Sequence, residues 1–356
     1  MKNKSISIDA RMINSSGVGT YLRNIIPILG KEFRVNLFGN CVELKAYDFG
    51  INYSCYEDTR SLYSVSNFFF NDKAESDIIW FPHFNVPLVI KRKRGAKIIT
   101  TIHDVYHLDN RKDIGWKKYI VSRVYFWQAT KRSTTVLTVS NFSRERLVHF
   151  FPDAIDKLVT IYNGVSLMKE SGRNGFMNNP YILFVGNVKP HKNIKRLIES
   201  FSLIKEEIPH KLVVVGKKDG FITADYDIVK VIEKHDLEER VYFTGFVSDQ
   251  VLNDWYCKSD VLVFPSLYEG FGFPPLEAMS AGVPTTVSNI PVLREICGNA
   301  SEFFDPHSPQ QIAESLLNLI NNLDLRAELI TKGFKRVEEF TWERSRNRHL
   351  KEFTSL

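Results

Sequence analysis

The chain has 356 residues, of which 44% are hydrophobic and 25% charged, a globular composition with room for two domains of ordinary size. Its net charge is +6, and it contains no run of about 18 apolar residues and no signal-peptide pattern, so we expect it to be neither exported nor membrane-spanning. The cysteines lack CxxC spacing, which predicts free thiols in a reducing cytoplasm rather than a zinc site or a disulfide framework (Cys41, Cys55, Cys257 and Cys297).

The charge is unevenly distributed along the chain. Residues 1–165 contain 24 Lys and Arg against 15 Asp and Glu, whereas residues 166–356 contain 23 against 26. Within the basic half, residues 91–94 (KRKR) and 111–132 combine cations with aromatic side chains. Such segments can lie on an anionic membrane surface, or they can form an amphipathic helix packed on its own sheet. No recognised nucleic-acid-binding motif accompanies this charge, so we expect no nucleic acid partner.

Strand-like and helix-like segments alternate along the chain, and the series restarts once. The first series has predicted strands at residues 5–9, 34–38, 77–81, 97–102 and 135–139, with helical stretches such as residues 21–29 between them. The second has predicted strands at residues 181–185, 211–215, 241–244, 261–264 and 284–287. This alternation indicates parallel α/β domains.

The restart predicts two domains. We expect a first α/β domain over residues 1–165 and a second over residues 180–340. Residues 166–179 are polar and contain glycine, which is typical of a hinge linker. The basic, helical tail at residues 341–356 is expected to pack back on the first domain.

The first glycine motif is Ser15-Ser16-Gly17-Val18-Gly19-Thr20, placed between the opening strand and a predicted helix. Position 22 is leucine, so the third glycine of a dinucleotide-binding fingerprint is missing. Two readings remain for Gly17 and Gly19: close approach of the backbone to a ligand, or a plain tight turn.

A titratable imidazole follows the predicted strand at residues 97–102. His103 and Asp104 stand at the carboxyl end of that strand, where the ligands of open α/β sheets bind. His103 is therefore a candidate for chemistry, and the alternative is a buried histidine whose nitrogens are satisfied by the protein.

In the second half, the strand at residues 181–185 runs into residues 186–193 (GNVKPHKN) and then a predicted helix at residues 194–204. Gly186 and Asn187 open this turn, and Lys192 at its end can neutralise a diphosphate as a point charge, unless it is a solvated lysine at a helix entry. Gly216 and Gly245 end the neighbouring predicted strands, so Val247 is placed to meet a base through its backbone.

The most informative stretch is Glu269-Gly270-Phe271-Gly272-Phe273-Pro274-Pro275-Leu276-Glu277, between a buried strand and a helix predicted at residues 276–281. Glycine lets the backbone approach a ligand, and amides near Gly272 and Phe273 can face an anion. The carboxylates of Glu269 and Glu277 are acceptors that suit sugar hydroxyls and are expected on opposite sides of one pocket. Otherwise Glu277 only favours the helix N-terminus and Glu269 is a solvated loop residue.

These motifs resemble the retaining glycosyltransferases of family four, which have the GT-B fold: an α/β architecture of two Rossmann-like domains with parallel sheets facing across a cleft. The resemblance rests on residues 186–193 and 269–284, and more loosely on residues 17–19, 101–104, 138–143 and 163–164. It implies that the first domain binds the acceptor and the second the nucleotide sugar.

The resemblance also implies residue roles. Glu277 would bind the ribose, Glu269 with Gly270, Phe271, Gly272 and Phe273 would hold the donor sugar, Lys192 would hold the diphosphate, and His103 would lie near the transferred sugar. Many family members have arginine where this chain has Asn187, so a single cation is expected at the diphosphate, with helix N-termini carrying more of the work. Gly17, Gly19, Gly186, Asn187 and Val247 complete the expected donor site.

The expected activity is metal-independent transfer of a hexose, with retention, from a GDP- or UDP-sugar and without a cofactor. The acceptor would be a lipid-linked glycan or an oligosaccharide, presented to a cytoplasmic enzyme associated peripherally with the inner face of the membrane. The pattern is most similar to bacterial surface-polysaccharide mannosyltransferases. A nucleotide-sugar epimerase, a phosphorylase or a catalytically silent nucleotide-sugar-binding subunit would fit the same architecture. Asp225 and Asp227, in a predicted polar connection, are not expected to bind metal.

Overall fold

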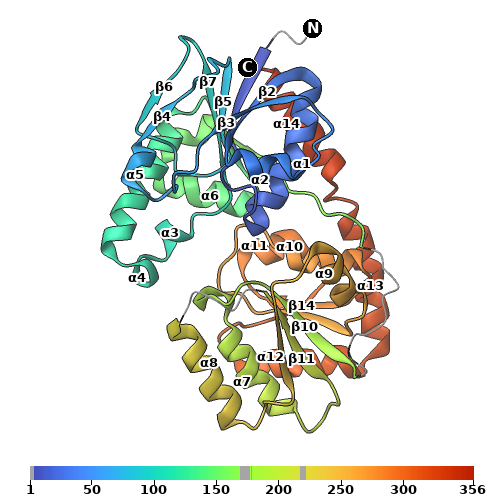
Figure 1. Cartoon of the computed structure of the whole chain (residues 1–356). Coiled ribbons are helices and arrows are strands. Elements are labelled where there is room, and N and C mark those ends of the chain that lie inside the picture. Colours follow the sequence, from blue (N-terminus) through green and yellow to red (C-terminus); the bar gives the residue numbers. More distant parts are fainter. Residues whose placement is uncertain (1–3, 169–176, 178, 217–221) are drawn as a thin grey trace. The chain divides into compact units, whose positions relative to one another are not determined.

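The computed structural model describes residues 4–168, 177, 179–216 and 222–356, without the side chains of residues 222–226. The chain divides into two compact units (Figure 1). The first unit contains Met1–Gly164 and Trp342–Leu356, and the second contains Val165–Thr341. The basic tail thus belongs to the first unit.

The first unit is built on a seven-stranded parallel sheet of order β3-β2-β1-β5-β7-β8-β9. Its strands are β1 (Lys4–Asp9), β2 (Phe33–Gly39), β3 (Tyr53–Glu57), β5 (Ile78–Phe81), β7 (Lys97–Ile102), β8 (Thr135–Thr138) and β9 (Leu158–Thr160). A separate two-stranded ribbon pairs β4 (Phe69–Asn71) with β6 (Val89–Lys91). The edge strands β3 and β9 were not predicted, because neither is an apolar run buried on both faces.

Helices cover this sheet. They are α1 (Ser16–Glu32), α2 (Cys41–Lys45), α3 (Tyr106–Asp109), α4 (Arg111–Ile114), α5 (Trp116–Arg132), α6 (Asn141–Phe150) and α14 (Trp342–Thr354), with short 3₁₀ turns η1 (Val65–Phe68) and η2 (Pro152–Lys157). Although α14 comes from the end of the chain, it packs along α1 (Figure 1). The helix α1 begins earlier than predicted, so Gly17 and Gly19 lie within its first turns and not in a loop before it.

Gly19 does permit a close approach, but to the protein's own backbone. A Cβ atom at this position would lie 2.3 Å from the carbonyl oxygen of Ile13, closer than a folded chain allows. The glycine therefore lets the turn after β1 fold against the start of α1.

The second unit has a six-stranded parallel sheet of order β12-β11-β10-β13-β14-β15. Its strands are β10 (Tyr181–Val185), β11 (Lys211–Val215), β12 (Val241–Gly245), β13 (Val261–Phe264), β14 (Thr285–Ser288) and β15 (Glu302–Phe304). Alternate residues of β10 enter different cores: Ile182 and Phe184 pack on one face, and Tyr181 and Leu183 on the other.

The helices of the second unit are α7 (Ile194–Ile204), α8 (Ile222–Lys234), α9 (Asp249–Cys257), α10 (Phe273–Ser280), α11 (Pro291–Cys297), α12 (Pro309–Asn321) and α13 (Leu323–Val337), with the turn η3 (Pro190–Lys192) before α7. Asp225 and Asp227 lie in α8, so the predicted polar connection there was wrong. Of the predicted linker, residues 169–176 and 178 lie outside the described residues. The Met168 N–H donates to Ser280 Oγ at 3.3 Å, so the start of that segment contacts the second unit.

The prediction of four free thiols was wrong for two of them. Cys41 and Cys55 form a disulfide with Cα atoms 5.9 Å apart. The cause is topological: α2 begins just after β2, and β3 pairs with β2 so that Cys55 lies opposite Leu37. Cys257 and Cys297 are not disulfide-bonded. No helix in the described part of the chain has the length and hydrophobicity needed to cross a bilayer.

Candidate active site

Lys192 and Glu269 meet at the carboxyl edge of the second sheet. Lys192 ends the turn η3 after β10, and Glu269 lies in the loop after the adjacent strand β13. The Lys192 ammonium donates to Glu269 Oε1 at 2.5 Å, and the side chains are 17% and 14% exposed. Neither is therefore a solvated surface residue, which removes the two alternatives left open by the sequence.

Two hydrogen bonds join the segment that contains Lys192 to the loop that contains Glu269. The Leu267 N–H donates to the His191 carbonyl at 2.7 Å, and Asn193 Nδ2 donates to the Pro265 carbonyl at 3.1 Å. Asn193 has φ +60°, a left-handed conformation that asparagine tolerates and that turns the chain from η3 into α7. Its structural role was not predicted.

The Lys192 ammonium also lies 5.3 Å from the centre of the Phe264 ring, within cation–π distance. A carboxylate on one side and an aromatic face on the other keep the cation fixed and partly shielded from water. Because an ammonium carries three donors, Lys192 can donate to an incoming phosphate while it keeps its hydrogen bond to Glu269. The pair can thus bind an anion and a hydroxyl-bearing group next to each other.

The loop that joins β13 to α10 is anchored by a buried aromatic side chain and a glycine. Phe271 is buried, with its ring centre 5.2 Å from Phe273 and 5.8 Å from Phe340. Gly272 has φ +124°, and a Cβ atom there would approach Leu293 to 2.9 Å, so only glycine fits. Gly270 lies between Glu269 and this anchored segment.

Glu277 has a hydrogen-bond partner that could not be predicted from local sequence. The helix α10 begins at Phe273, three residues before the prediction, so Glu277 lies past the first turn. Its Oε2 accepts a hydrogen bond of 2.6 Å from the hydroxyl of Tyr256 in α9. Burial raises the pKa of Glu277 above its ordinary value. Tyr256 is itself fully buried. In the sequence it looks like any other aromatic residue of the core, so nothing marks it as a partner of Glu277.

The remaining predicted residues of the second unit lie on the same edge. The Gly186 N–H donates to the Val215 carbonyl at 2.9 Å, and Asn187 is half-buried in the segment that leads to η3. Val247 follows β12 and packs against the core beside Tyr181. The structure thus brings Gly186, Asn187, Lys192 and residues 269–273 to one sheet edge.

Three predicted residues belong to the first unit: Gly17 and Gly19 in α1, and His103 after β7. His103 Nε2 lies 3.1 Å from the Pro82 carbonyl, and its ring meets the Tyr21 ring edge-on at 5.0 Å. Burial lowers the pKa of His103 to about 4, so the imidazole is neutral near pH 7. The side chain is half-buried, and its Nε2 has the Pro82 carbonyl as its partner.

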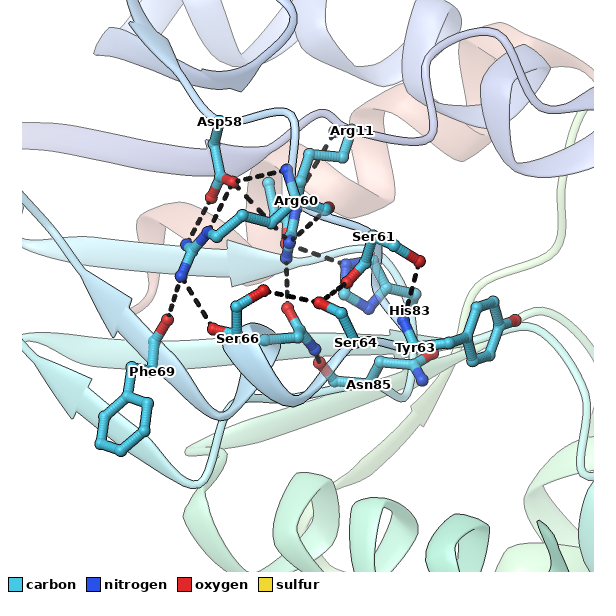
Figure 2. A network of polar contacts seen from close by, with 12 residues as sticks. Arg11, Asp58, Arg60, Ser61, Tyr63, Ser64, Ser66, Phe69, His83 and Asn85 are labelled. Atoms are coloured by element: carbon cyan, nitrogen blue, oxygen red, sulfur yellow. Dashed lines mark hydrogen bonds and ion pairs between the residues drawn. The ribbon is translucent and has the colours of Figure 1, made fainter.

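A second polar cluster in the first unit was not predicted at all (Figure 2). Asp9, the last residue of β1, accepts from Arg11 Nε at 2.8 Å and lies 3.0 Å from His83 Nε2. Arg11 also donates to Asn67 Oδ1 at 2.8 Å. Burial alone would raise the pKa of Asp9, but the hydrogen bond from Arg11 and the charge of His83 hold it well below its ordinary value.

No group of three or more His, Cys, Asp or Glu suited to a metal ion is present among the residues that the structure describes. Lys192, Glu269 and Glu277 supply one cation and two carboxylates in the second unit. These are the parts needed to hold an anion and a polyhydroxylated ligand together.

The sequence matches two family models, described as Glycosyltransferase Family 4 over residues 16–169 and Glycosyl transferases group 1 over residues 169–336. It is 27% identical to O-antigen chain mannosyltransferase B of Escherichia coli, over 74% of this chain and 70% of that protein. It is 32% identical to the uncharacterized glycosyltransferase MJ1607 of Methanocaldococcus jannaschii, again over 74% and 70%. The match to the serotype-specific mannosyltransferase WbdA of Escherichia coli covers only 36% of that longer protein.

Solved structures show the same fold. HepE of Anabaena, solved in complex with UDP and glucose, superposes with a TM-score of 0.79 at 16% identity, over 99% of this chain and 100% of that one. WaaG, a glycosyltransferase involved in lipopolysaccharide biosynthesis, gives 0.75 at 14% identity, over 97% and 98%. The chain therefore belongs to glycosyltransferase family 4 and has the GT-B fold, two Rossmann-like domains with parallel sheets.

Proposed function

We propose that this glycosyltransferase moves a hexose, with mannose as the first candidate, from a nucleoside-diphosphate sugar to a glycan acceptor in surface-polysaccharide synthesis. The observation that carries the proposal is the Lys192–Glu269 pair at the carboxyl edge of the second sheet, beside a glycine loop and Glu277. In this assignment Lys192 binds the diphosphate, Glu269 and the loop bind the sugar, and Glu277 binds the ribose. His103 of the first unit acts on the transferred sugar.

The proposed reaction retains the configuration of the anomeric carbon and needs no metal. The bond from that carbon to the diphosphate oxygen breaks, the acceptor hydroxyl oxygen bonds to the carbon on the same face, and its proton passes to the departing diphosphate. Lys192 and the backbone amides near Gly272 and Phe273 stabilise the charge that develops on the diphosphate, since Pro274 and Pro275 carry no N–H. Glu269 is committed to Lys192, which argues for a role in holding the sugar and against one as a covalent nucleophile.

The mannosyltransferase names of the relatives support mannose, whereas the UDP and glucose of the HepE structure favour a different donor. A panel of nucleotide sugars separates these cases by thermal unfolding. At a hundredfold excess over Kd, the true donor should raise Tm by about 5 °C.

Glu277→Ala should remove that shift, and Glu314→Ala, at an exposed position of α12, should keep it. If no GDP- or UDP-hexose shifts Tm, the proposed donor class is wrong. Donor isomerised without acceptor would indicate an epimerase, and binding without turnover with any acceptor would indicate a silent subunit.

We further propose that the acceptor is lipid-linked and that helix α5 docks the enzyme on an anionic bilayer. Five large apolar side chains of this helix are exposed: Trp116, Ile120, Val121, Val124 and Trp127. Exposed cations lie between them at Lys117, Lys118 and Arg123. Apolar groups beside cations suit the boundary between anionic headgroups and acyl chains.

Docking should be visible as sedimentation with phosphatidylglycerol vesicles. Raising the salt concentration should release the protein, because the attraction to the headgroups is screened. The double variant Trp116→Ala/Trp127→Ala should bind severalfold more weakly, whereas Leu323→Ala, an exposed apolar residue of the second unit, should bind like the parent. Equal binding by all three proteins would exclude α5 as the docking surface.

A further inference from the structure

Tyr21 connects the C-terminal helix to the candidate residue His103 within the first unit. Its side chain, on α1, is fully buried. Its hydroxyl lies 2.6 Å from His349 Nε2 of α14 and 3.0 Å from Thr101 Oγ1 of β7. Its ring stands edge-on to His103, with the centres 5.0 Å apart and the planes at 87°. One aromatic residue thus contacts two histidines that are far apart in the sequence.

The hydrogen-bond partners fix which way each proton points. His349 Nδ1 lies 2.7 Å from the Ser345 carbonyl, which can only accept, so this nitrogen carries the hydrogen. Burial lowers the pKa of His349 to about 4, so the ring is neutral and its Nε2 accepts. Tyr21 must therefore donate its hydroxyl hydrogen to His349.

The hydrogen bonds on the Thr101 side of Tyr21 are consistent with Tyr21 donating to His349. Trp80 Nε1 can only donate, and it lies 3.0 Å from Thr101 Oγ1. The Thr101 hydroxyl is then available to donate to the Tyr21 oxygen. All these groups are buried. In this series of hydrogen bonds Trp80 donates to Thr101, Thr101 to Tyr21, Tyr21 to His349, and His349 to the Ser345 carbonyl, so every donor has an acceptor.

The orientation of His103 follows from the same geometry. Its Nε2 faces the Pro82 carbonyl at 3.1 Å and must donate there, which leaves Nδ1 of the neutral ring as an acceptor. Thr101 lies near the end of β7 and His103 directly after it, and Tyr21 of α1 contacts both side chains, so both face the α1 side of the sheet. The Tyr21 ring lies against the imidazole on that side and limits its rotation.

We infer that Tyr21 and His349 are positioning residues for His103: the C-terminal helix, acting through Tyr21, holds the imidazole so that Nδ1 accepts a hydrogen bond from a hydroxyl of the transferred sugar. The role of His103 in this inference rests on the proposed function. The network itself explains why a helix that follows the second unit in the chain packs on α1 of the first.

The test uses Tyr21→Phe, which keeps the ring and removes the hydroxyl, together with His349→Leu and His349→Gln in the full-length enzyme. Tyr21→Phe and His349→Leu should lower kcat about tenfold with little change in KM for the donor, because a small misplacement affects the reacting geometry more than binding. His349→Gln should restore most of the rate, since its amide oxygen can accept from Tyr21.

The decisive control is the same pair of substitutions in a His103→Ala background. If they act through His103, kcat should not fall further there; an equal tenfold loss in both backgrounds would show a structural effect unrelated to His103 and overturn the inference. Nitrogen-15 spectra of the imidazoles give a second readout without any substrate. They should show His103 with hydrogen on Nε2 in the parent, and a shifted or broadened His103 Nδ1 signal in Tyr21→Phe, whose ring has lost the hydrogen bonds that anchor it. Unchanged spectra would also overturn the inference. Full activity of His103→Ala alone would instead count against the proposed role of His103.

Discussion

Replacement of Lys192 by alanine is expected to lower kcat by about 10²–10³, the loss typical of removing one group that stabilises charge in a transition state. The substitution removes the cation assigned to the diphosphate and leaves the Glu269 carboxylate, 14% exposed, without its hydrogen-bond donor. A departing diphosphate would then meet a negative charge. The measurement is kcat with a nucleotide sugar and an acceptor under saturating conditions.

Lys189→Ala is the matched control, because Lys189 lies three residues earlier and its side chain is exposed. It should keep the parent kcat. Glu269→Gln should also lose activity, since an amide cannot form the ion pair, and the Tm of each variant shows that folding is retained. Parent-like kcat in both Lys192→Ala and Glu269→Gln would refute the proposed catalytic centre.

Much of the fold could be predicted from local sequence. The strand β10 and the helix α7 have the predicted bounds, because an apolar run and a helical pattern are separated by glycine, proline and polar residues. The strand β3 was missed because it is an edge strand whose side chains are mostly half-exposed, so it lacks the apolar run of a buried parallel strand.

In the candidate site, the residues could be predicted from local sequence but their contacts could not. Lys192 and Glu269 could be chosen as candidates because each lies in a segment that follows a predicted parallel strand. Such segments lie at the carboxyl edge of the sheet, where ligands bind. The contact between Lys192 and Glu269 could not be predicted, since it depends on β10 and β13 being neighbours in the sheet. Partners such as Tyr256 for Glu277 come from elements distant in the sequence and resemble ordinary core residues, so no local pattern marks them.

The disulfide illustrates a different limit. Cys41 and Cys55 carry no spacing signal, and composition favours free thiols in a chain of this size. Only the pairing of β3 with β2 brings the two residues together. The disulfide therefore depends on tertiary contacts, which the number and spacing of the cysteines do not reveal.

The second large effect concerns stability and the buried charge cluster at the end of β1. Arg11→Ala should lower the free energy of unfolding by about 3–5 kcal/mol, because it leaves the Asp9 carboxylate, which is 1% exposed, without its guanidinium partner. Urea unfolding at pH 7 measures this loss. Lys93→Ala breaks a half-exposed ion pair with Asp77 in the same unit and should cost about 1 kcal/mol or less.

The same cluster predicts how stability depends on pH. The pKa of Asp9 is held well below its ordinary value in the folded protein, whereas the unfolded chain binds a proton near pH 3.9. Above about pH 4 the ionised Asp9 carboxylate contributes its full stabilisation. Below that pH, Asp9 of the unfolded chain binds a proton that Asp9 of the folded protein does not, so the free energy of unfolding falls. Asp9→Asn should be less stable than the parent at pH 7 and should lose this part of the acid sensitivity. If the difference in unfolding free energy between Asp9→Asn and the parent is the same at pH 3 and pH 7, Asp9 is not the ionised centre of the cluster.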